Sequence, residues 1–302
     1  MNRRRFLGAL ALAAAGCKSK TTPPSAGTRI VSLSPGITDA IFALGAGSRL
    51  VARSDYCEHP KEALALPRVG TSITPSYEAI ARLEPTLIVS EDNAAARRRE
   101  LEALSPTLLL RWLSLEEVAR GLRELGRVTD APERGESLAK ELELRLGVPP
   151  PASGPRVLLA MGTQGIRLDE VWFIRKNSLQ GAALHAAGAR NAVEEDVPGQ
   201  PRLSLERLVA LDPDSILVLT PSEKADDALA EPFRKLETLR AVKSGRLAVL
   251  AAPEAYVNGP RALALIERLR SALARFEASA PAPSPSVAGS ASTPASSSPG
   301  RR

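Results

Sequence analysis

The amino-acid sequence predicts an α/β fold with parallel sheets, arranged as two lobes of related design. Short β-branched or leucine-rich runs alternate with longer helical patterns along the chain, which is the order of a parallel α/β sheet. One helix–strand pattern, which begins at Ser76, recurs at Ser204. Between the two copies, the run of Pro149, Pro150 and Pro151 separates two strand–helix sets.

The strands are expected at short apolar runs, because strands that are buried on both faces are continuously apolar. In chain order they are residues 29–33, 50–53, 87–90, 107–110, 157–161, 216–219 and 247–250. The helices are expected where apolar residues recur every three or four positions. They are residues 38–44, 76–83, 93–104, 115–127, 178–187, 205–211 and 260–276.

Two helix starts carry a capping signature. Ser114 and Glu117 fit a capping box at the start of the helix expected at 115–127. Asp130 and Glu133 fit a second box, before a helix that runs to about Leu146. The proline run then ends this second helix, so a connector between the two lobes is expected here.

The internal repeat has the same physical logic in both copies, which are residues 76–89 and 204–217. In each copy a serine is placed to cap a helix, and a glutamate follows two residues later. An acid–proline pair then stops the helix before an apolar strand. The two lobes are therefore expected to follow one plan.

The formal net charge of +6 comes from the two ends of the chain. Residues 1–27, together with Arg301 and Arg302, hold seven of the 40 basic residues and no acid, so the body between them is almost neutral. A protein that neutralises many phosphates needs a cationic face. Nucleic acid is therefore not expected as a partner.

The first 17 residues have the pattern of an export signal: a basic start, an apolar core of about ten residues and small residues at the end. The order Arg-Arg-x-Phe-Leu resembles a twin-arginine signal, and Ala-Ala-Gly before Cys17 resembles a lipobox, in which the cysteine is acylated. We expect a lipid-anchored protein on the periplasmic side of the cell envelope. Ordinary cleavage, with Cys17 incidental, is the alternative.

Composition divides the rest of the chain. Ser, Thr, Pro and Gly before residue 28 predict a flexible tether, and the Ala, Ser and Pro that dominate the C-terminal end predict a disordered tail. The expected parts are a signal peptide (1–17), a tether (18–27), an N-terminal lobe (28–128), a connecting helix (129–148), a C-terminal lobe (149–277) and a tail (278–302).

Several segments together resemble one family. They are the RIVSLSPGITDAIFALGAG run at 29–47, DYCEHP at 55–60, LPRVG at 66–70, AGARN at 187–191, GPR at 259–261 and the two repeat copies. In order and spacing they resemble the class III substrate-binding proteins of ABC importers, which take up cobalamin, haem and ferric siderophores. Among these, the vitamin B12-binding proteins are the most similar.

This resemblance implies two Rossmann-like lobes joined by a single long connecting helix, with a metal chelate held in the cleft between them. It implies no catalytic cofactor and no enzymatic activity. The expected partners are an ABC permease with its ATPase, the chelate, and the membrane through the lipid anchor, and the chain is expected to be a monomer. The resemblance favours cobalamin as the ligand, with a ferric siderophore or haem as alternatives.

The resemblance also assigns a role to the repeated glutamates. Glu78 and Glu206 align with the pair, one in each lobe, that forms ion pairs with arginines of the permease. The alternative is that glutamate merely favours the first turn of any helix.

In the N-terminal lobe, the loop after the second strand is expected at the carboxyl edge of the sheet, where open α/β sheets bind ligands. Tyr56 aligns with a ligand-contacting aromatic residue of cobalamin binders. Cys57 is a candidate for ligand contact, and the alternatives are a metal ligand, a reactive thiol or a small buried residue. His59 is a candidate axial metal ligand, and no other metal site is expected. Ser72 stands where aromatic-rich cobalamin binders carry tryptophan.

In the C-terminal lobe, Trp172 aligns with a cleft aromatic residue and Tyr256 is a second candidate at the same mouth. Arg175 and Lys176 are weaker candidates, for an anionic group of the ligand. Trp112 follows a leucine-rich strand and is expected in the core. The Pro198–Pro201 loop has no aromatic residue, and aromatic residues are only 3% of the chain, so the alternatives to a corrinoid stay open.

Two other classes of function are open to an exported protein of this kind. An exported enzyme would need a nucleophile elbow, a phosphate loop or a metal-binding helix motif, and the sequence contains none of these. A ligand-sensing lipoprotein would keep the fold without transport. The glutamates of the repeat favour the importer over the sensor.

Overall fold

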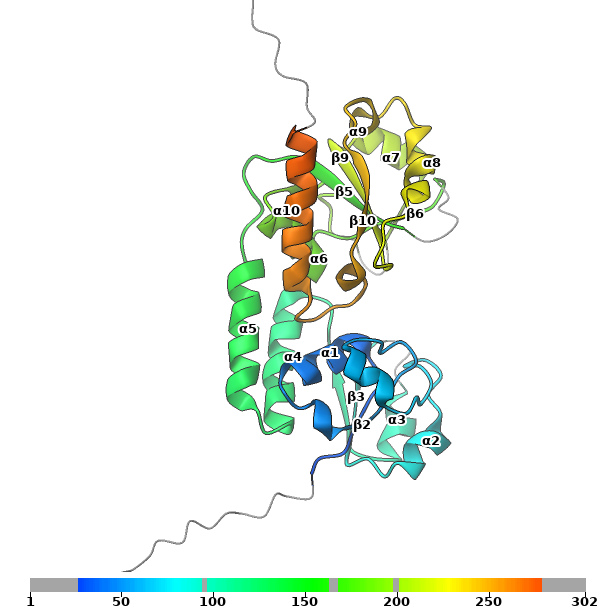
Figure 1. Ribbon diagram of the computed structural model, residues 1–302, viewed down its shortest axis with the longest axis vertical. Coiled ribbons are helices and arrows are strands. Elements are labelled where there is room, and N and C mark those ends of the chain that lie inside the picture. Colours follow the sequence, from blue (N-terminus) through cyan, green and yellow to red (C-terminus); the bar gives the residue numbers. More distant parts are fainter. Residues whose placement is uncertain (1–26, 94–96, 163–167, 198–200, 279–302) are drawn as a thin grey trace, which may run out of the picture.

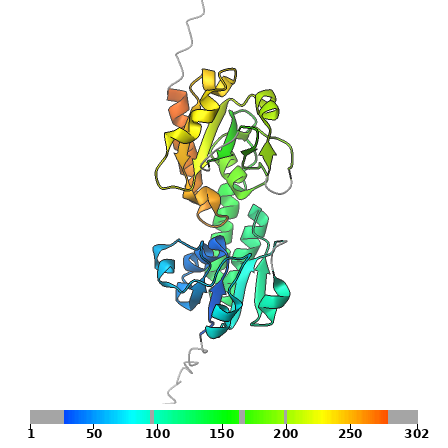
Figure 2. The ribbon, with the colours of Figure 1, turned by 90° about the vertical axis from the view of Figure 1, so that its right-hand side faces the viewer.

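The computed structural model describes residues 27–93, 97–162, 168–197 and 201–278. Figures 1 and 2 show two lobes stacked along the long axis of the molecule, with the N-terminal lobe at the bottom. The expected signal peptide with Cys17, the expected tether up to residue 26, residues 198–200 of the Pro198–Pro201 loop and the expected tail from residue 279 lie outside the described residues.

The N-terminal lobe is built on a parallel sheet with strand order β2-β1-β3-β4. Its strands are β1 (Ile30–Ser32), β2 (Leu50–Arg53), β3 (Leu87–Glu91) and β4 (Thr107–Leu110). Its helices are α1 (Pro35–Ala43), α2 (Tyr77–Arg82) and α3 (Arg98–Glu102), with short 3-10 turns at Gly47–Arg49 and Lys61–Ala65. The central strand β1 is buried throughout and β3 is buried except at its two ends, which explains their apolar runs.

The C-terminal lobe repeats this design with a parallel sheet of order β10-β9-β5-β7. These strands are β5 (Arg156–Met161), β7 (Arg190–Asn191), β9 (Ser215–Thr220) and β10 (Leu247–Ala251). Its helices are α6 (Leu179–Ala186), α7 (Leu205–Leu211), α8 (Glu231–Arg234), α9 (Arg240–Lys243) and α10 (Ala262–Ala278), with 3-10 turns at Asp227–Ala230 and Pro253–Tyr256. A separate antiparallel ribbon pairs β6 (Val171–Trp172) with β8 (Arg202–Leu203).

The repeat has the same geometry in both lobes. Ser76 and Ser204 each cap the following helix, with the serine hydroxyl accepting the N–H of the third residue after it at 3.3 Å. The acid before each proline has a left-handed backbone, with φ of 43° at Glu84 and 38° at Asp212. Each helix therefore ends in the same turn before its strand.

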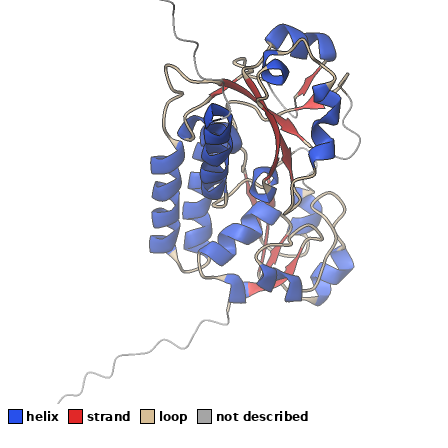
Figure 3. Ribbon diagram, turned by 45° about the horizontal axis from the view of Figure 1, so that its top comes forward, coloured by secondary structure: helices blue, strands red, loops and turns tan. Residues whose placement is uncertain are grey.

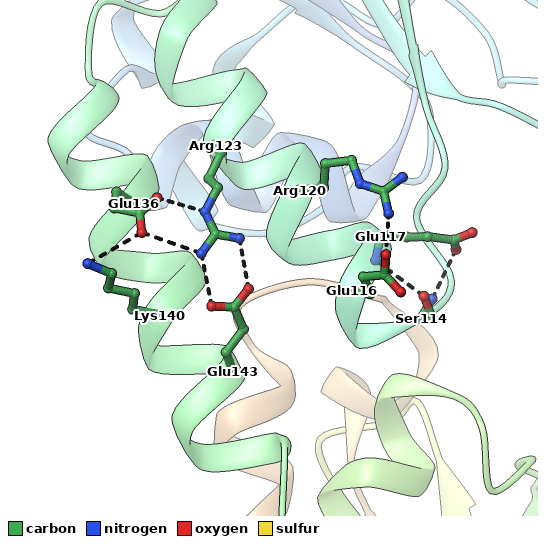
Figure 4. A network of polar contacts seen from close by, with 8 residues as sticks. All are labelled: Ser114, Glu116, Glu117, Arg120, Arg123, Glu136, Lys140 and Glu143. Atoms are coloured by element: carbon green, nitrogen blue, oxygen red, sulfur yellow. Dashed lines mark hydrogen bonds and ion pairs between the residues drawn. The ribbon is translucent and has the colours of Figure 1, made fainter.

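The chain passes from the N-terminal to the C-terminal lobe along one helix, α5 (Pro132–Leu146), as the connecting helix was expected to do (Figure 1). This helix forms a hairpin with α4 (Leu115–Val128), and the hairpin lies with α10 along one side of the molecule (Figures 1 and 3). The hairpin is tight because a Cβ at Gly135 would lie only 2.7 Å from the carbonyl oxygen of Leu122. Arg123 on α4 binds Glu136 and Glu143 on α5, each at 2.7 Å (Figure 4). The hydrogen bonds that this guanidinium donates to both carboxylates raise its pKa, so it stays charged.

The capping box of Ser114 and Glu117 is confirmed, with both of its hydrogen bonds formed (Figure 4). The second predicted box is wrong. Proline at position 132 starts α5, and neither Asp130 nor Glu133 caps it. Asp130 has a left-handed backbone instead, and its carboxylate lies 2.9 Å from the guanidinium of Arg49.

The predicted fold is confirmed: two α/β lobes with parallel sheets. All seven predicted strands are present, with bounds within one residue on most sides. The ribbon strands and β7 were not predicted, because two residues are too few to show a period. One buried core runs through both lobes along α4, α5 and α10, and each lobe has a smaller core of its own. Within the described ranges, no helix combines the length and apolarity that a bilayer span requires.

Candidate ligand-binding site

A cavity of about 330 Å³ lies where the two lobes meet. Almost all of its wall comes from the C-terminal lobe, at the carboxyl end of β5, the ribbon, the start of α6 and the 3-10 turn before α10, which is where open α/β sheets bind ligands. Only Leu113, after β4, comes from the N-terminal side. The lining residues are Leu113, Met161, Trp172, Phe173, Ile174, Arg175, Ser178, Gln180, Pro201, Ala255, Tyr256 and Asn258.

Trp172 lines this cavity and is held in place by the ribbon. The register of the ribbon puts Arg202 opposite Trp172, and the guanidinium carbon lies 4.7 Å from the centre of the tryptophan ring. The same guanidinium forms an ion pair with Glu170. One side of the ring is therefore covered by a fixed cation, which orients the aromatic wall.

Tyr256 lines the same cavity, but its hydroxyl is already used. It donates to the backbone carbonyls of Leu219 at 2.7 Å and of Gly162 at 3.2 Å. Burial raises the pKa of this phenol to about 12, so it stays protonated. Tyr256 therefore offers a ligand its ring rather than a phenolate.

The cavity contains residues that the sequence did not single out, among them Leu113, Met161, Gln180 and Asn258. Trp112 is buried as predicted, and it also bridges the lobes, because its indole Nε1 donates to the carbonyl oxygen of Asn258 at 2.6 Å. No local sequence pattern marks these residues, since the partners lie far apart in the chain. A polar residue inside an otherwise apolar loop, as in Tyr-Val-Asn before Gly259, is the one available signal.

The two weaker basic candidates, Arg175 and Lys176, differ in whether they line the cavity. Arg175 lines the cavity and donates to the backbone carbonyl of Val197 at 3.1 Å. Lys176 is not among the lining residues and lies 3.4 Å from the carboxylate of Asp196. Of this pair, Arg175 is the residue in a position to meet a bound molecule.

Tyr56 and Ser72 lie on neighbouring loops of the N-terminal lobe and do not line the cavity. The loops are tied together by the N–H of Asp55, which donates to the carbonyl of Gly70 at 2.8 Å. The side chains of Tyr56 and Ile73 are 71% and 59% exposed, respectively. Both side chains are therefore exposed on this lobe, outside the wall of the cavity.

Cys57 is a correction. The sequence placed it among the residues that contact the ligand, but its side chain is fully buried in the N-terminal lobe. The sulfur accepts the hydroxyl of Thr38 at 3.0 Å and lies 3.2 Å from the hydroxyl of Ser54. Burial raises the pKa of the thiol. Cys57 is therefore the small buried residue of the alternative reading.

His59 belongs to a charged cluster that joins the lobes. Its Nδ1 lies 3.1 Å from one carboxylate oxygen of Asp39 on α1, and Arg261, before α10, lies 3.3 Å from the other oxygen. Burial raises the pKa of Asp39, and its contacts with Arg261 and His59 oppose that shift. In the part of the chain that the structure describes, no three His, Cys, Asp or Glu residues gather as metal ligands. The geometry therefore gives His59 a structural neighbour in Asp39.

Glu78 on α2 and Glu206 on α7 are both exposed, and Figure 1 shows these helices on the side of the molecule away from α5. They differ in their surroundings. Glu78 forms an ion pair with Arg82 on its own helix at 2.6 Å. Glu206 accepts from its own backbone N–H and from Ser204, which lowers its pKa.

Comparison with known proteins agrees with this geometry. The family model described as a periplasmic binding protein matches residues 30–254. The vitamin B12-binding protein of Pectobacterium atrosepticum is 27% identical over 208 residues, which are 65% of this chain and 73% of that protein. The vitamin B12-binding protein of Vibrio cholerae serotype O1 (strain M66-2) is 33% identical over 126 residues, 41% of this chain and 46% of that protein.

Solved structures share the architecture over nearly their whole length. A periplasmic haem binding protein from Pseudomonas aeruginosa superposes with a TM-score of 0.66 at 27% identity, covering 84% of this chain and 94% of that one. The periplasmic vitamin B12 binding protein of Vibrio cholerae superposes with a TM-score of 0.63 at 25% identity, covering 83% of this chain and 98% of that one.

Proposed function

Because the chain belongs to the periplasmic binding protein family, we propose that it captures a metal chelate, cobalamin or another corrinoid, and delivers it to an ABC permease. This family consists of binding proteins of transporters rather than enzymes, and it implies a periplasmic location. The proposal is carried by the cavity between the lobes, which is walled by Trp172, Phe173 and Tyr256. The names of the curated relatives support the same ligand.

The chemistry of the cavity favours a chelate that brings its own metal ligands. The hydroxyl of Tyr256 is used by two backbone carbonyls and its pKa is raised to about 12, so it is poorly suited to bind ferric iron as phenolate. His59 is paired with Asp39 and does not line the cavity. A corrinoid already holds its cobalt in a macrocycle and needs shape and apolar contact from the protein.

Haem is the second candidate, and one residue favours it. The thioether of Met161 lines the cavity, and methionine serves as an axial haem ligand in other proteins. Titration with haemin, followed by its absorption spectrum, tests this reading. A spectrum that shifts with the native chain and not with Met161→Leu would support haem, whereas cyanocobalamin binding with no haemin response would support the corrinoid.

The ligand is tested directly by calorimetry on the purified protein with cyanocobalamin, haemin and several ferric siderophores. We expect cyanocobalamin to bind with a Kd below about 10 μM, or roughly −7 kcal/mol. Binding of none of these chelates below that value would refute the proposed function.

Delivery to the permease is proposed to use Glu78 and Glu206. Both are exposed carboxylates at equivalent positions of the repeat, as suits charge-assisted contact with arginine. Reversing both charges should abolish uptake of the chelate into cells and leave its affinity for the purified protein unchanged. Normal uptake by the double variant would contradict docking through these residues and would favour a sensing role.

We also propose that the protein is exported by the twin-arginine route and anchored through acylated Cys17, with the parts of the chain bounded as the composition predicts. The support is the order of residues 1–17. Radiolabelled palmitate should label the native protein and not Cys17→Ala. Label that survives this substitution would rule the anchor out.

A further inference from the structure

Two neutral amide side chains lie together in the wall of the cavity. Gln180 is in the first turn of α6 and is 94% buried, with a relative exposure of 6%. Asn258 lies in the loop between the 3-10 turn at Pro253–Tyr256 and α10. Both line the cavity, although 78 residues of chain separate them.

The orientation of both amides follows from their hydrogen bonds. The carbonyl oxygen of Ala255 can only accept, so the Gln180 atom 3.0 Å from it must be the nitrogen, Nε2. The same nitrogen lies 2.9 Å from the Asn258 side chain, which must therefore turn its oxygen, Oδ1, toward Gln180. The main chain of Asn258 is fixed as well, by the indole N–H of Trp112.

These hydrogen bonds do not use two of the amide atoms, which are the oxygen Oε1 of Gln180 and the nitrogen Nδ2 of Asn258. Across the described residues no hydrogen bond is found for either atom, and neither atom is sealed away from the cavity. The hydroxyls nearby are already used, because Ser178 donates to Arg175 and accepts from Gly181, and Tyr256 donates to two carbonyls. The pair therefore offers a ligand one neutral acceptor and one neutral donor, side by side.

We propose that the Gln180–Asn258 pair recognises a primary amide group on the edge of the chelate and selects amide-bearing ligands over carboxylate-bearing ones. A primary amide donates to the Gln180 oxygen through its NH2 and accepts from the Asn258 nitrogen through its carbonyl. A carboxylate has only acceptor atoms at neutral pH, so it would place an anion against the partly buried Gln180 oxygen. This inference rests on the proposed function and makes the specificity of the same cavity explicit.

Arg175 is the competing recognition group, because it is the charged residue of the cavity wall. A cavity that selected anions would depend on this guanidinium. The ion-free pairing of Gln180 with Asn258 and the Arg175 bond to the Val197 carbonyl favour the neutral amide.

The test compares cyanocobalamin with its monocarboxylic acids, in each of which one peripheral amide is hydrolysed to a carboxylate. Affinities of the native chain for each compound are measured by calorimetry at neutral pH. We expect at least one acid to bind about tenfold more weakly or worse than the parent amide, since one hydrogen bond is lost and an acceptor is left facing an anion. This series does not depend on whether any variant folds.

Asn258→Asp is the matched variant, because it keeps the oxygen that Gln180 needs and removes the donor. It should weaken cyanocobalamin binding about tenfold with an unchanged Tm, and it should weaken the binding of the critical acid still further. Arg175→Gln tests the competing recognition group and should change the ratio of amide to acid affinity less than threefold. Lys176→Gln, at a residue that does not line the cavity, is the control.

The outcomes are distinguishable. Equal affinity for cyanocobalamin and all its acids, or an amide preference that vanishes in Arg175→Gln and persists in Asn258→Asp, would overturn the amide inference while the proposed function stands. Failure of the native chain to bind cyanocobalamin while it binds another chelate would overturn the corrinoid ligand and the amide inference, and failure to bind any of the chelates would overturn the proposed function as well.

Discussion

The two lobes share one scaffold and differ at the cleft. Both have a four-stranded parallel sheet, and in both a serine-capped helix ends in a left-handed acid before a proline. The C-terminal lobe adds the β6–β8 ribbon, which carries Trp172 into the cavity wall. The N-terminal lobe offers exposed Tyr56 and Ile73 on loops outside that cavity. The sheet and helix arrangement shared by both lobes therefore forms the scaffold, and the candidate ligand site depends on the β6–β8 ribbon, which the C-terminal lobe adds to it.

The lobes also differ in how they treat buried acids. In the N-terminal lobe burial raises the pKa of Glu91, and among the described residues the hydroxyl of Ser34, at 2.6 Å, is the hydrogen-bond partner found for it. In the C-terminal lobe partial burial of Asp214 is outweighed by the N–H of Arg156 and the guanidinium of Arg240, so its pKa is lowered. Lowering the pH should therefore increase the stability that Glu91 contributes to the N-terminal lobe and decrease the stability that Asp214 contributes to the C-terminal lobe.

The largest expected effect is the loss of stability at Trp112, compared with that at Trp172, the other tryptophan of the chain. Trp112→Ala removes a buried ring and its bond to Asn258, so we expect the free energy of unfolding to fall by about 3–5 kcal/mol. Trp172→Ala, on the partly exposed ribbon, should lower it by less than half as much. Urea unfolding followed by circular dichroism measures both. Equal losses of unfolding free energy in the two variants would show that the β6–β8 ribbon contributes to stability as much as the core does.

The next effect concerns affinity. Trp172→Ala should weaken chelate binding by about 2 kcal/mol, or roughly 30-fold, because an aromatic residue in the cavity wall anchors the ligand. Tyr56→Ala, its counterpart on the N-terminal lobe, should weaken binding by less than about fivefold. Calorimetric titration with cyanocobalamin distinguishes them. A larger loss for Tyr56→Ala would reverse the asymmetry between the lobes.

The pH response sharpens the comparison of acids. Because the pKa of Glu91 is raised in the folded state, its contribution to stability falls as the pH rises from about 4 through that pKa. Glu91→Gln should therefore raise the free energy of unfolding by up to about 1 kcal/mol at pH 7 and change it little near pH 4. A lowered folded pKa means that the contribution of Asp214 is present above about pH 4 and is lost as pH falls further. Asp214→Asn should therefore destabilise at pH 7 and converge with the native chain below about pH 3.

Denaturant unfolding of both variants from pH 3 to pH 7 measures these slopes. The two difference curves should have opposite signs at neutral pH. Difference curves of the same sign would mean that Glu91 and Asp214 do not have pKa shifts of opposite direction in the folded protein.

The smallest effect uses the repeat itself. Glycine is favoured at a positive φ, so Glu84→Gly should raise the free energy of unfolding by up to about 1 kcal/mol. Asp212→Gly relieves the same backbone but removes the carboxylate that accepts the N–H of Arg240 at 2.7 Å, so it should give no gain. Thermal unfolding compares the two. A gain at both positions would show that the Asp212 contact is dispensable.

Much of the scaffold could be read from local patterns. Buried strands are continuously apolar, and a serine followed three residues later by glutamate predicts the start of α4, because both signals act over a few residues. The same local reasoning failed at Asp130, where a distant arginine, Arg49, competes for the carboxylate. Likewise Cys57 was misplaced, since its burial depends on Thr38 from another element.

The sequence by itself determined the two-lobed α/β plan, the repeat and the composition of the two ends, because periodicity, capping and charge are properties of short stretches. Only the tertiary structure decided which side chains line the cavity. It brought Trp112 to Asn258 across 146 residues and Gln180 to Asn258 across 78. Such contacts depend on how the lobes pack along α4, α5 and α10, and packing between distant segments leaves no period in the chain.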